Sequence, residues 1–278
     1  MEKIDGIRKQ WEKAADGWAK WEWVFESWTK PATEAMLNMA GVDSGAKVLD
    51  LACGSGSQTL NAARRVVPDG HIVAIDISET MLQHVRDKAF TEHLDNISTH
   101  NSTAEELNVP TETFDSAICS IGLMLFVNPR QALTSVKNSL KAGGKVSVSV
   151  FTTPASNVFM AKPMQILLKH AGKEPPLKGE PGIFSLGQPG VIENLLMESG
   201  FVDIQKDIFS IPLKMSSAVQ ALEMLQEAAG AYRAVVSDCP EDVQTAAWKE
   251  VAKALKSFET EDGFNANGEL AAAGGTKP

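Results

Sequence analysis

The chain has 278 residues, of which 44% are hydrophobic and 22% charged, and its formal net charge at pH 7 is −9. This length suits one large α/β domain with a covering insertion, and no apolar run reaches the roughly 18 residues of a membrane span. The negative charge disfavours binding to a phosphate backbone, and the first residues lack the apolar core of a signal peptide. We therefore expect a cytoplasmic protein that neither binds nucleic acid nor spans a membrane.

Aromatic residues are concentrated near the N-terminus. Trp11, Trp18, Trp21, Phe25 and Trp28 recur at steps of seven, three, four and three, which places them on one face of a helix. That face either packs on a domain core or belongs to a lid that closes over a ligand, and the spacing is compatible with both. We assign residues 1–40 to an N-terminal helical lid.

From Lys47 onwards, strand patterns alternate with helix patterns. The predicted strands cover residues 47–51, 71–76, 97–101, 114–120 and 145–151, and the predicted helices between them cover 57–67, 79–89 and 130–140. Such alternation is typical of a parallel sheet with right-handed crossovers. We therefore assign residues 41–152 to an α/β core.

The pattern changes after Phe151. Residues 153–190 contain one predicted helix, 157–171, and a loop rich in proline and glycine. We interpret this segment as a cap inserted over the carboxyl edge of the sheet.

Residues 191–278 are assigned to the C-terminal part of the core, with a helical insertion. A helix over 191–199 resumes the earlier pattern, and residues 216–258 predict two helices with a break near Pro240. The tail from Gly263 is either a last strand or a frayed end.

The segment with the most chemical information is Val48-Leu49-Asp50-Leu51-Ala52-Cys53-Gly54-Ser55-Gly56, in which a strand runs into a loop of small residues that opens a helix. Glycines let the backbone approach a ligand closely, and a helix N-terminus offers unpaired N–H groups. Asp50 would repel a pyrophosphate but suits an ammonium group. Thr59 replaces the third glycine of the dinucleotide-binding pattern. Both features favour a cofactor that carries an amino acid and no phosphate.

Asp76 ends the second predicted strand, 22 residues after Gly54. A carboxylate at this distance is typical of one that accepts both hydroxyls of a ribose. A helix-capping or surface aspartate is the alternative, and the combination with Asp50 and the loop favours the ribose contact. Ile77 and Met81 follow and are placed to pack against an adenine.

Together these segments resemble the class I S-adenosylmethionine (SAM)-dependent methyltransferases, closest to the branch that includes ubiquinone- and menaquinone-type C-methyltransferases. The run from Asp50 to Gly56 looks like their DxGxGxG motif, with Ala52 at the first glycine, and Asp76 matches their second motif. Residues 102–105 resemble the segment after the third strand, with Thr103 where the family has an aspartate that reaches adenine. Residues 114–124 and 140–145 resemble the fourth motif and the turn into the fifth strand.

The resemblance implies a Rossmann-like, doubly wound seven-stranded sheet of order 3-2-1-4-5-7-6 with the last strand antiparallel. It also implies SAM as cofactor and methyl transfer by in-line displacement to a small-molecule acceptor. The expected cofactor-binding residues are Asp50, Ala52, Cys53, Gly54, Ser55, Gly56, Asp76, Ile77, Met81, Thr103, Ala104, Ser120, Trp11 and Trp18.

Other features of the sequence limit the chemistry. The three cysteines and five histidines lack the spacing of metal ligands, so no metal is expected. No residue is identified as a catalytic base, because positioning and water exclusion supply most of the catalysis in a direct transfer. We expect a monomer or a homodimer.

Three alternatives remain at this point. Asp50 and the missing third glycine oppose a nicotinamide-dependent oxidoreductase. A non-catalytic SAM-binding protein would show the same motifs. A nucleic-acid or protein methyltransferase would share the fold, but the acidic charge and the absence of the N/D-P-P-Y/F motif of amino-directed enzymes oppose it.

Overall fold

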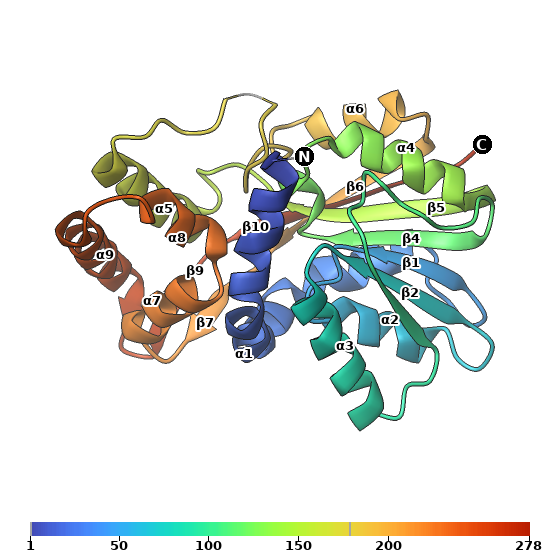
Figure 1. Ribbon diagram of the computed structural model, residues 1–278, viewed down its shortest axis with the longest axis horizontal. Coiled ribbons are helices and arrows are strands. Elements are labelled where there is room, and N and C mark those ends of the chain that lie inside the picture. The colour runs from blue at the N-terminus through green and yellow to red at the C-terminus, as the bar shows by residue number, and fades with distance from the viewer. Residues whose placement is uncertain (1, 178) are drawn as a thin grey trace.

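The computed structural model describes residues 2–177 and 179–278 and has a seven-stranded sheet at its centre (Figure 1). The strands are β1 (Lys47–Leu51), β2 (His71–Asp76), β3 (Ile97–Asn101), β4 (Phe114–Ser120), β5 (Leu140–Phe151), β6 (Val202–Ser210) and β10 (Glu269–Thr276). Their order is β3-β2-β1-β4-β5-β10-β6. The strands β1 to β5 pair in parallel, and β10 is antiparallel to both of its neighbours. Because β10 is the seventh strand of this sheet in chain order, the predicted Rossmann-like order is confirmed.

Helices cover both faces of the sheet and form a separate group beside it. They are α1 (Glu2–Met39), α2 (Ser57–Arg65), α3 (Glu79–Thr91), α4 (Pro129–Ser139), α5 (Val158–Ala171), α6 (Val191–Glu198), α7 (Ala218–Glu227), α8 (Gly230–Val236) and α9 (Glu241–Leu255). Figure 1 shows α2 and α3 on one face, α4 and α6 on the other, and α5, α7, α8 and α9 grouped to one side. The helix α1 lies between this group and the sheet.

Smaller elements complete the fold. A second sheet has the order β7-β9-β8, from strands β7 (Leu213–Met215), β8 (Glu259–Thr260) and β9 (Gly263–Ala266). Two 3₁₀ turns, η1 (Leu123–Leu125) and η2 (Lys256–Phe258), follow β4 and α9. The C-terminal tail therefore contributes strands to both sheets and is not a frayed end.

Most predicted helices end within two residues of the observed bounds, and two expectations were wrong. Residues 216–258 form three helices, because the chain also turns between α7 and α8. Arg233 donates hydrogen bonds to the carbonyl oxygens of Gln226 and Glu227 and so satisfies the last turn of α7. Strand β5 begins at Leu140 instead of Lys145, since the glycine turn pairs with the C-terminal strand: Gly143 N–H donates to the Lys277 carbonyl.

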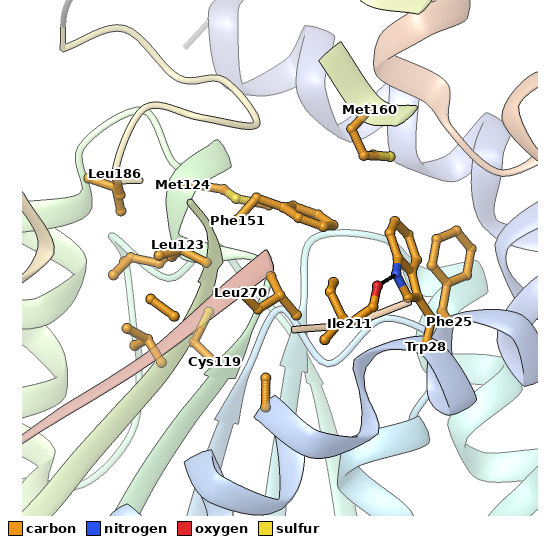
Figure 2. Close-up of a cluster of buried hydrophobic side chains, with 14 of the residues drawn as sticks. Phe25, Trp28, Cys119, Leu123, Met124, Phe151, Met160, Leu186, Ile211 and Leu270 are labelled. Carbon is orange, nitrogen blue, oxygen red and sulfur yellow. Dashed lines mark hydrogen bonds between the residues drawn. The ribbon is translucent and has the colours of Figure 1, made fainter. Parts of the chain in front are cut away.

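The helix α1 packs against both the seven-stranded sheet and the separate group of helices. In its C-terminal half, Met36 and Leu37 are fully buried in an apolar cluster with residues of β1, β2 and α2. In the middle, the Trp28 indole N–H donates to the Ile211 carbonyl at 2.7 Å (Figure 2). The N-terminal half covers the carboxyl ends of the strands. It approaches α7 so closely that a Cβ on Gly17 would lie 2.1 Å from the Glu227 carbonyl oxygen.

This close approach predicts opposite effects for two glycine substitutions in one helix. Gly17→Ala should lower the free energy of unfolding by about 1 to 3 kcal/mol, because the added methyl group forces α1 away from α7. Gly6→Ala has nothing within 4 Å of the new methyl group and should raise it by roughly 0.5 to 1 kcal/mol through helix propensity. Urea unfolding measures both. Equal stability of the two variants would contradict the observed packing of α1.

Candidate functional site

A large cavity opens where β1, β2 and β4 end and the N-terminal half of α1 crosses over them. Its empty volume, the open mouth included, is about 1340 Å³. Loops at the carboxyl ends of parallel strands are the usual binding edge of an open α/β sheet.

The loop that follows β1 forms the floor of the cavity. Ala52 and Gly54 line it, whereas Cys53, Ser55 and Gly56 do not. The backbone is left-handed at Ala52 (φ 51°) and Gly54 (φ 55°). Ala52 thus has a backbone conformation that glycine adopts more readily, which agrees with its place at the first glycine of the motif. A Cβ on Gly54 would lie 3.3 Å from the indole nitrogen of Trp18. Gly54 therefore permits the close contact between this loop and α1.

Asp76 links this loop to the next helix. Its carboxylate is 7% exposed and lines the cavity. One oxygen accepts the Gly54 N–H and the other accepts the Ser78 N–H, both at 2.9 Å. Burial raises the pKa of Asp76 to about 6, and these backbone hydrogen bonds limit the rise. Each carboxylate oxygen retains a second lone pair, so Asp76 can still accept hydrogen bonds from a ligand.

Asp50 is not brought to the cavity surface. It is fully buried beneath the loop, where it accepts hydrogen bonds from the Thr59 hydroxyl at 2.6 Å and from Gln58 Nε2 at 3.3 Å. Burial raises its pKa from an ordinary 3.8 to about 7. Asp50 therefore lies outside the lining of the cavity, and its contact with an ammonium group stays a prediction. Asp50 instead ties the loop to the first turn of α2, through the threonine that replaces the third glycine.

The remaining predicted residues lie on two walls. Ile77 and Met81 follow β2, Thr103 and Ala104 follow β3, and Ser120 ends β4, and all five line the cavity. The Thr103 hydroxyl also accepts the Glu106 N–H at 3.2 Å, and Ser120 lies 3.3 Å from the Ser149 hydroxyl.

The helix α1 forms the roof. Trp11 and Trp18 both line the cavity, with ring centroids 5.8 Å apart in an edge-to-face arrangement, and Trp18 stacks on Phe25 at 4.1 Å. Trp23 points elsewhere and is 56% exposed. The aromatic face of the predicted helix is therefore partly core and partly cavity wall.

Two glutamates attach this roof to the sheet side. Glu12 accepts the backbone N–H groups of Glu79 at 2.7 Å and Thr80 at 3.3 Å, so it caps the N-terminus of α3. Glu22 accepts the Ser55 hydroxyl at 2.8 Å and forms an ion pair with Lys88. These two contacts join α1 directly to the loop after β1 and to the helix after β2.

Much of the opposite wall was not found from the sequence. Phe126, Phe151, Met160, Ile183, Met224, Leu225 and Tyr232 line it, and they come from segments far apart in the chain. Figure 2 shows the Phe151 ring beside Trp28, with ring centroids 5.6 Å apart, and Met160 above them in this view. The Tyr232 hydroxyl donates to the Met160 carbonyl at 2.8 Å, and burial raises the pKa of this phenol.

Within α5, Met160 lines the cavity. Met164, Ile166 and Leu167 of the same helix lie outside the lining and pack in the protein interior. Within residues 2–177 and 179–278, no three His, Cys, Asp or Glu side chains are grouped to hold a metal ion. No helix in this part of the chain is long and apolar enough to cross a membrane.

Comparison with known proteins identifies the domain. Residues 42–176 match a family described as a methyltransferase domain. The ubiquinone/menaquinone biosynthesis C-methyltransferase UbiE of Pseudomonas aeruginosa is 36% identical over 123 residues, which are 44% of this chain and 48% of that protein. The chain thus matches about half the length of these relatives.

Solved structures agree on the fold. The YcgJ protein of Bacillus subtilis has a TM-score of 0.61 at 15% identity, covering 89% of this chain and 98% of that one. Phosphoethanolamine N-methyltransferase 2 of Haemonchus contortus, in complex with SAM, has a TM-score of 0.57 at 17% identity, covering 94% and 56%. Residues 42–176 therefore resemble a methyltransferase domain, and the solved structures share the fold of this chain.

The position of Asp76 predicts its effect on ligand binding. Asp76→Ala should weaken the binding of S-adenosylhomocysteine by about 1 to 3 kcal/mol, because a buried charged acceptor is lost. Asp115→Ala, which removes an aspartate paired with Lys141 away from the cavity, should leave binding unchanged. Titration calorimetry measures both. Unchanged affinity in a folded Asp76→Ala protein would remove Asp76 from the site.

The burial of Asp50 predicts a pH-dependent stability difference. An unfolded chain ionises this carboxyl near pH 3.8, whereas the folded chain keeps the proton until about pH 7. The contribution of Asp50 to folding stability is therefore full at low pH and is lost as the pH rises through this window. Asp50→Asn has no such loss, so its stability relative to wild type should rise by about 2 to 3 kcal/mol between pH 5 and pH 8. Urea unfolding at the two pH values tests this; a pH-independent difference would show that Asp50 is ionised throughout.

Proposed function

We propose that this protein is a methyltransferase that moves the methyl group of SAM to a small-molecule acceptor. The observation that carries the proposal is a single cavity with two unlike halves. One half contains Gly54, Asp76 and Thr103, and the other is lined by Phe151, Met160 and Met224. The first half suits a nucleoside and the second an apolar acceptor, so both reactants share one covered space.

The residues divide the binding of the cofactor between them. Asp76 is positioned to accept the ribose hydroxyls, and Ile77 and Met81 are positioned beside it to pack on the adenine. Asp50 acts indirectly, because its hydrogen bonds to Thr59 and Gln58 hold the loop in place. Trp18 then covers the loop at Gly54.

The chemistry requires little beyond this arrangement. When bound, SAM would supply an activated methyl group for transfer to the acceptor, and Asp76, Ile77 and Met81 would hold it in the cavity. The protein aligns the acceptor with that methyl group and keeps water out, which are large contributions to the rate of such a transfer. The aromatic roof and the apolar wall provide this exclusion.

A methyl-transfer assay tests the proposal. The protein should convert SAM to S-adenosylhomocysteine in step with methylation of at least one compound in a panel of quinols, phenols, amines and thiols, followed by mass spectrometry. Tighter binding of NADH than of SAM would favour an oxidoreductase. Binding of SAM without methylation of any compound in the panel would favour a non-catalytic SAM-binding protein.

We also propose that the N-terminal half of α1 is a lid that opens for ligand exchange. It covers the cavity, and its contacts to α3 and to the loop are polar: Glu12 accepts an exposed N–H of Glu79, and Glu22 forms a partly buried ion pair with Lys88. Exposed polar contacts are individually weak, and lids belong to the less stable parts of a structure.

Tryptophan fluorescence tests the lid. Adding S-adenosylhomocysteine should change the emission, and Trp18→Phe should remove most of that change, because Trp18 contacts the loop at Gly54. Trp23→Phe is the matched control, since this side chain lies on the same helix outside the cavity, and it should preserve the response. A response that depends on Trp23 and not on Trp18 would contradict closure over the cofactor.

A further inference from the structure

The charges of the cavity wall point to the chemical class of the acceptor. We infer that the acceptor is an uncharged, mainly apolar molecule without a phosphate, carboxylate or sulfonate group. The inference rests on the proposed function, since it concerns the acceptor half of the same cavity.

No cation lies in the described wall of the cavity. Its ionisable side chains are the carboxylates of Asp76 and Glu105, the latter accepting the Asn128 N–H at 3.2 Å, and the phenol of Tyr232. Two carboxylates suit the positive sulfonium of SAM. They repel a second ligand that carries negative charge.

Three cations near the cavity are paired with other groups. Lys88 pairs with Glu22, and Lys20 pairs with Glu227. Arg233 donates to the carbonyl oxygens that end α7. On the first turns of α1, Arg8, Lys9 and Lys13 all lie outside the wall; Arg8 is 3.9 Å from Asp5, and its Nε atom is buried without a hydrogen-bond partner. An anionic group in the acceptor half would therefore find no counter-charge on a side chain of the described wall, which is strongly unfavourable for a buried charge.

Polar groups in the acceptor half are also largely occupied. Tyr232 donates its hydroxyl proton to the Met160 carbonyl, and Ser120 lies within hydrogen-bond distance of Ser149. What remains is apolar surface from Phe151, Met224 and their neighbours. Binding there gains mainly from removing apolar area from water, at roughly 25 cal/mol per Å². The wall thus selects against charge and for apolar area at the same time.

This preference separates the chain from one of its structural neighbours. The Haemonchus contortus enzyme is named for phosphoethanolamine, which carries a phosphate group. The fold is shared, but the cavity of the present chain offers no basic side chain for such a group within its described wall.

Two fluorescent probes that differ by one sulfonate test the inference. N-phenyl-1-naphthylamine is neutral, and 8-anilino-1-naphthalenesulfonate is its anionic counterpart. With the protein saturated with S-adenosylhomocysteine, the neutral probe should bind at least tenfold more tightly. Ala231→Trp, which fills the cavity at a partly exposed position on α8, should remove this binding and so show that it occurs in the cavity.

A charge variant makes the test specific to the wall. Ile183→Lys places a cation in the wall at a partly exposed position and should bring the affinities of the two probes within threefold of each other. Leu177→Lys is the matched control, because Leu177 lies outside the wall in the same connecting segment and is 73% exposed; it should leave the tenfold preference intact.

Three results would overturn the inference: equal or tighter binding of the anionic probe to the wild-type cavity, neutral-probe binding that survives Ala231→Trp, or no change of preference in Ile183→Lys. Failure of the proposed function is seen separately, as absence of S-adenosylhomocysteine binding in calorimetry. In that case the comparison of the two probes without S-adenosylhomocysteine still decides the preference of the wall.

Discussion

The carboxylate of Asp76 accepts two backbone N–H groups, and the geometry of the site depends on this contact. Through the Gly54 N–H, Asp76 holds the loop after β1. Through the Ser78 N–H, it holds the start of α3. The Ser78 hydroxyl caps α3 by accepting the Met81 N–H and also donates to Glu12 of the roof. One buried acid therefore connects floor, wall and roof. Its burial is unfavourable for the charged form, and a cofactor that donates hydrogen bonds to it would offset part of that cost.

The roof is held differently on its two sides. Toward α3 and the loop, α1 makes side-chain contacts through Glu12 and Glu22. Toward α7, the backbones meet at Gly17 and Glu227 with no side chain between them. Exposed polar contacts, such as that of Glu12 with the Glu79 N–H, break at little cost, whereas close backbone packing resists separation. We expect the cavity to open on the α3 side, while α1 stays with α7 and α8.

The strands and the cofactor loop were predictable because local pattern determines them. Alternating elements and the position of Asp76 follow from periodicity and motif, and the order of the sheet was implied by the resemblance to the methyltransferase family. The direction of the Asp50 side chain could not be predicted, since strand position alone does not say whether a carboxylate faces the ligand or the next helix. The sequence does not decide whether β10 is a strand, because Ala271, Gly274 and Gly275 have low strand propensity. In the structure these small residues fit a crowded central position of the sheet: a Cβ on Gly274 would lie 2.8 Å from the Val146 carbonyl oxygen. The residues that line the acceptor half of the cavity are brought together by the packing of helices far apart in the chain, which no local sequence pattern encodes.

A crystal structure of the complex with S-adenosylhomocysteine tests the central claim most directly. The account predicts ribose hydroxyls within hydrogen-bond distance of Asp76, and the sulfur atom facing the half lined by Phe151 and Met160. Binding of the ligand outside this cavity, or in the reverse direction with adenine against Phe151, would contradict it.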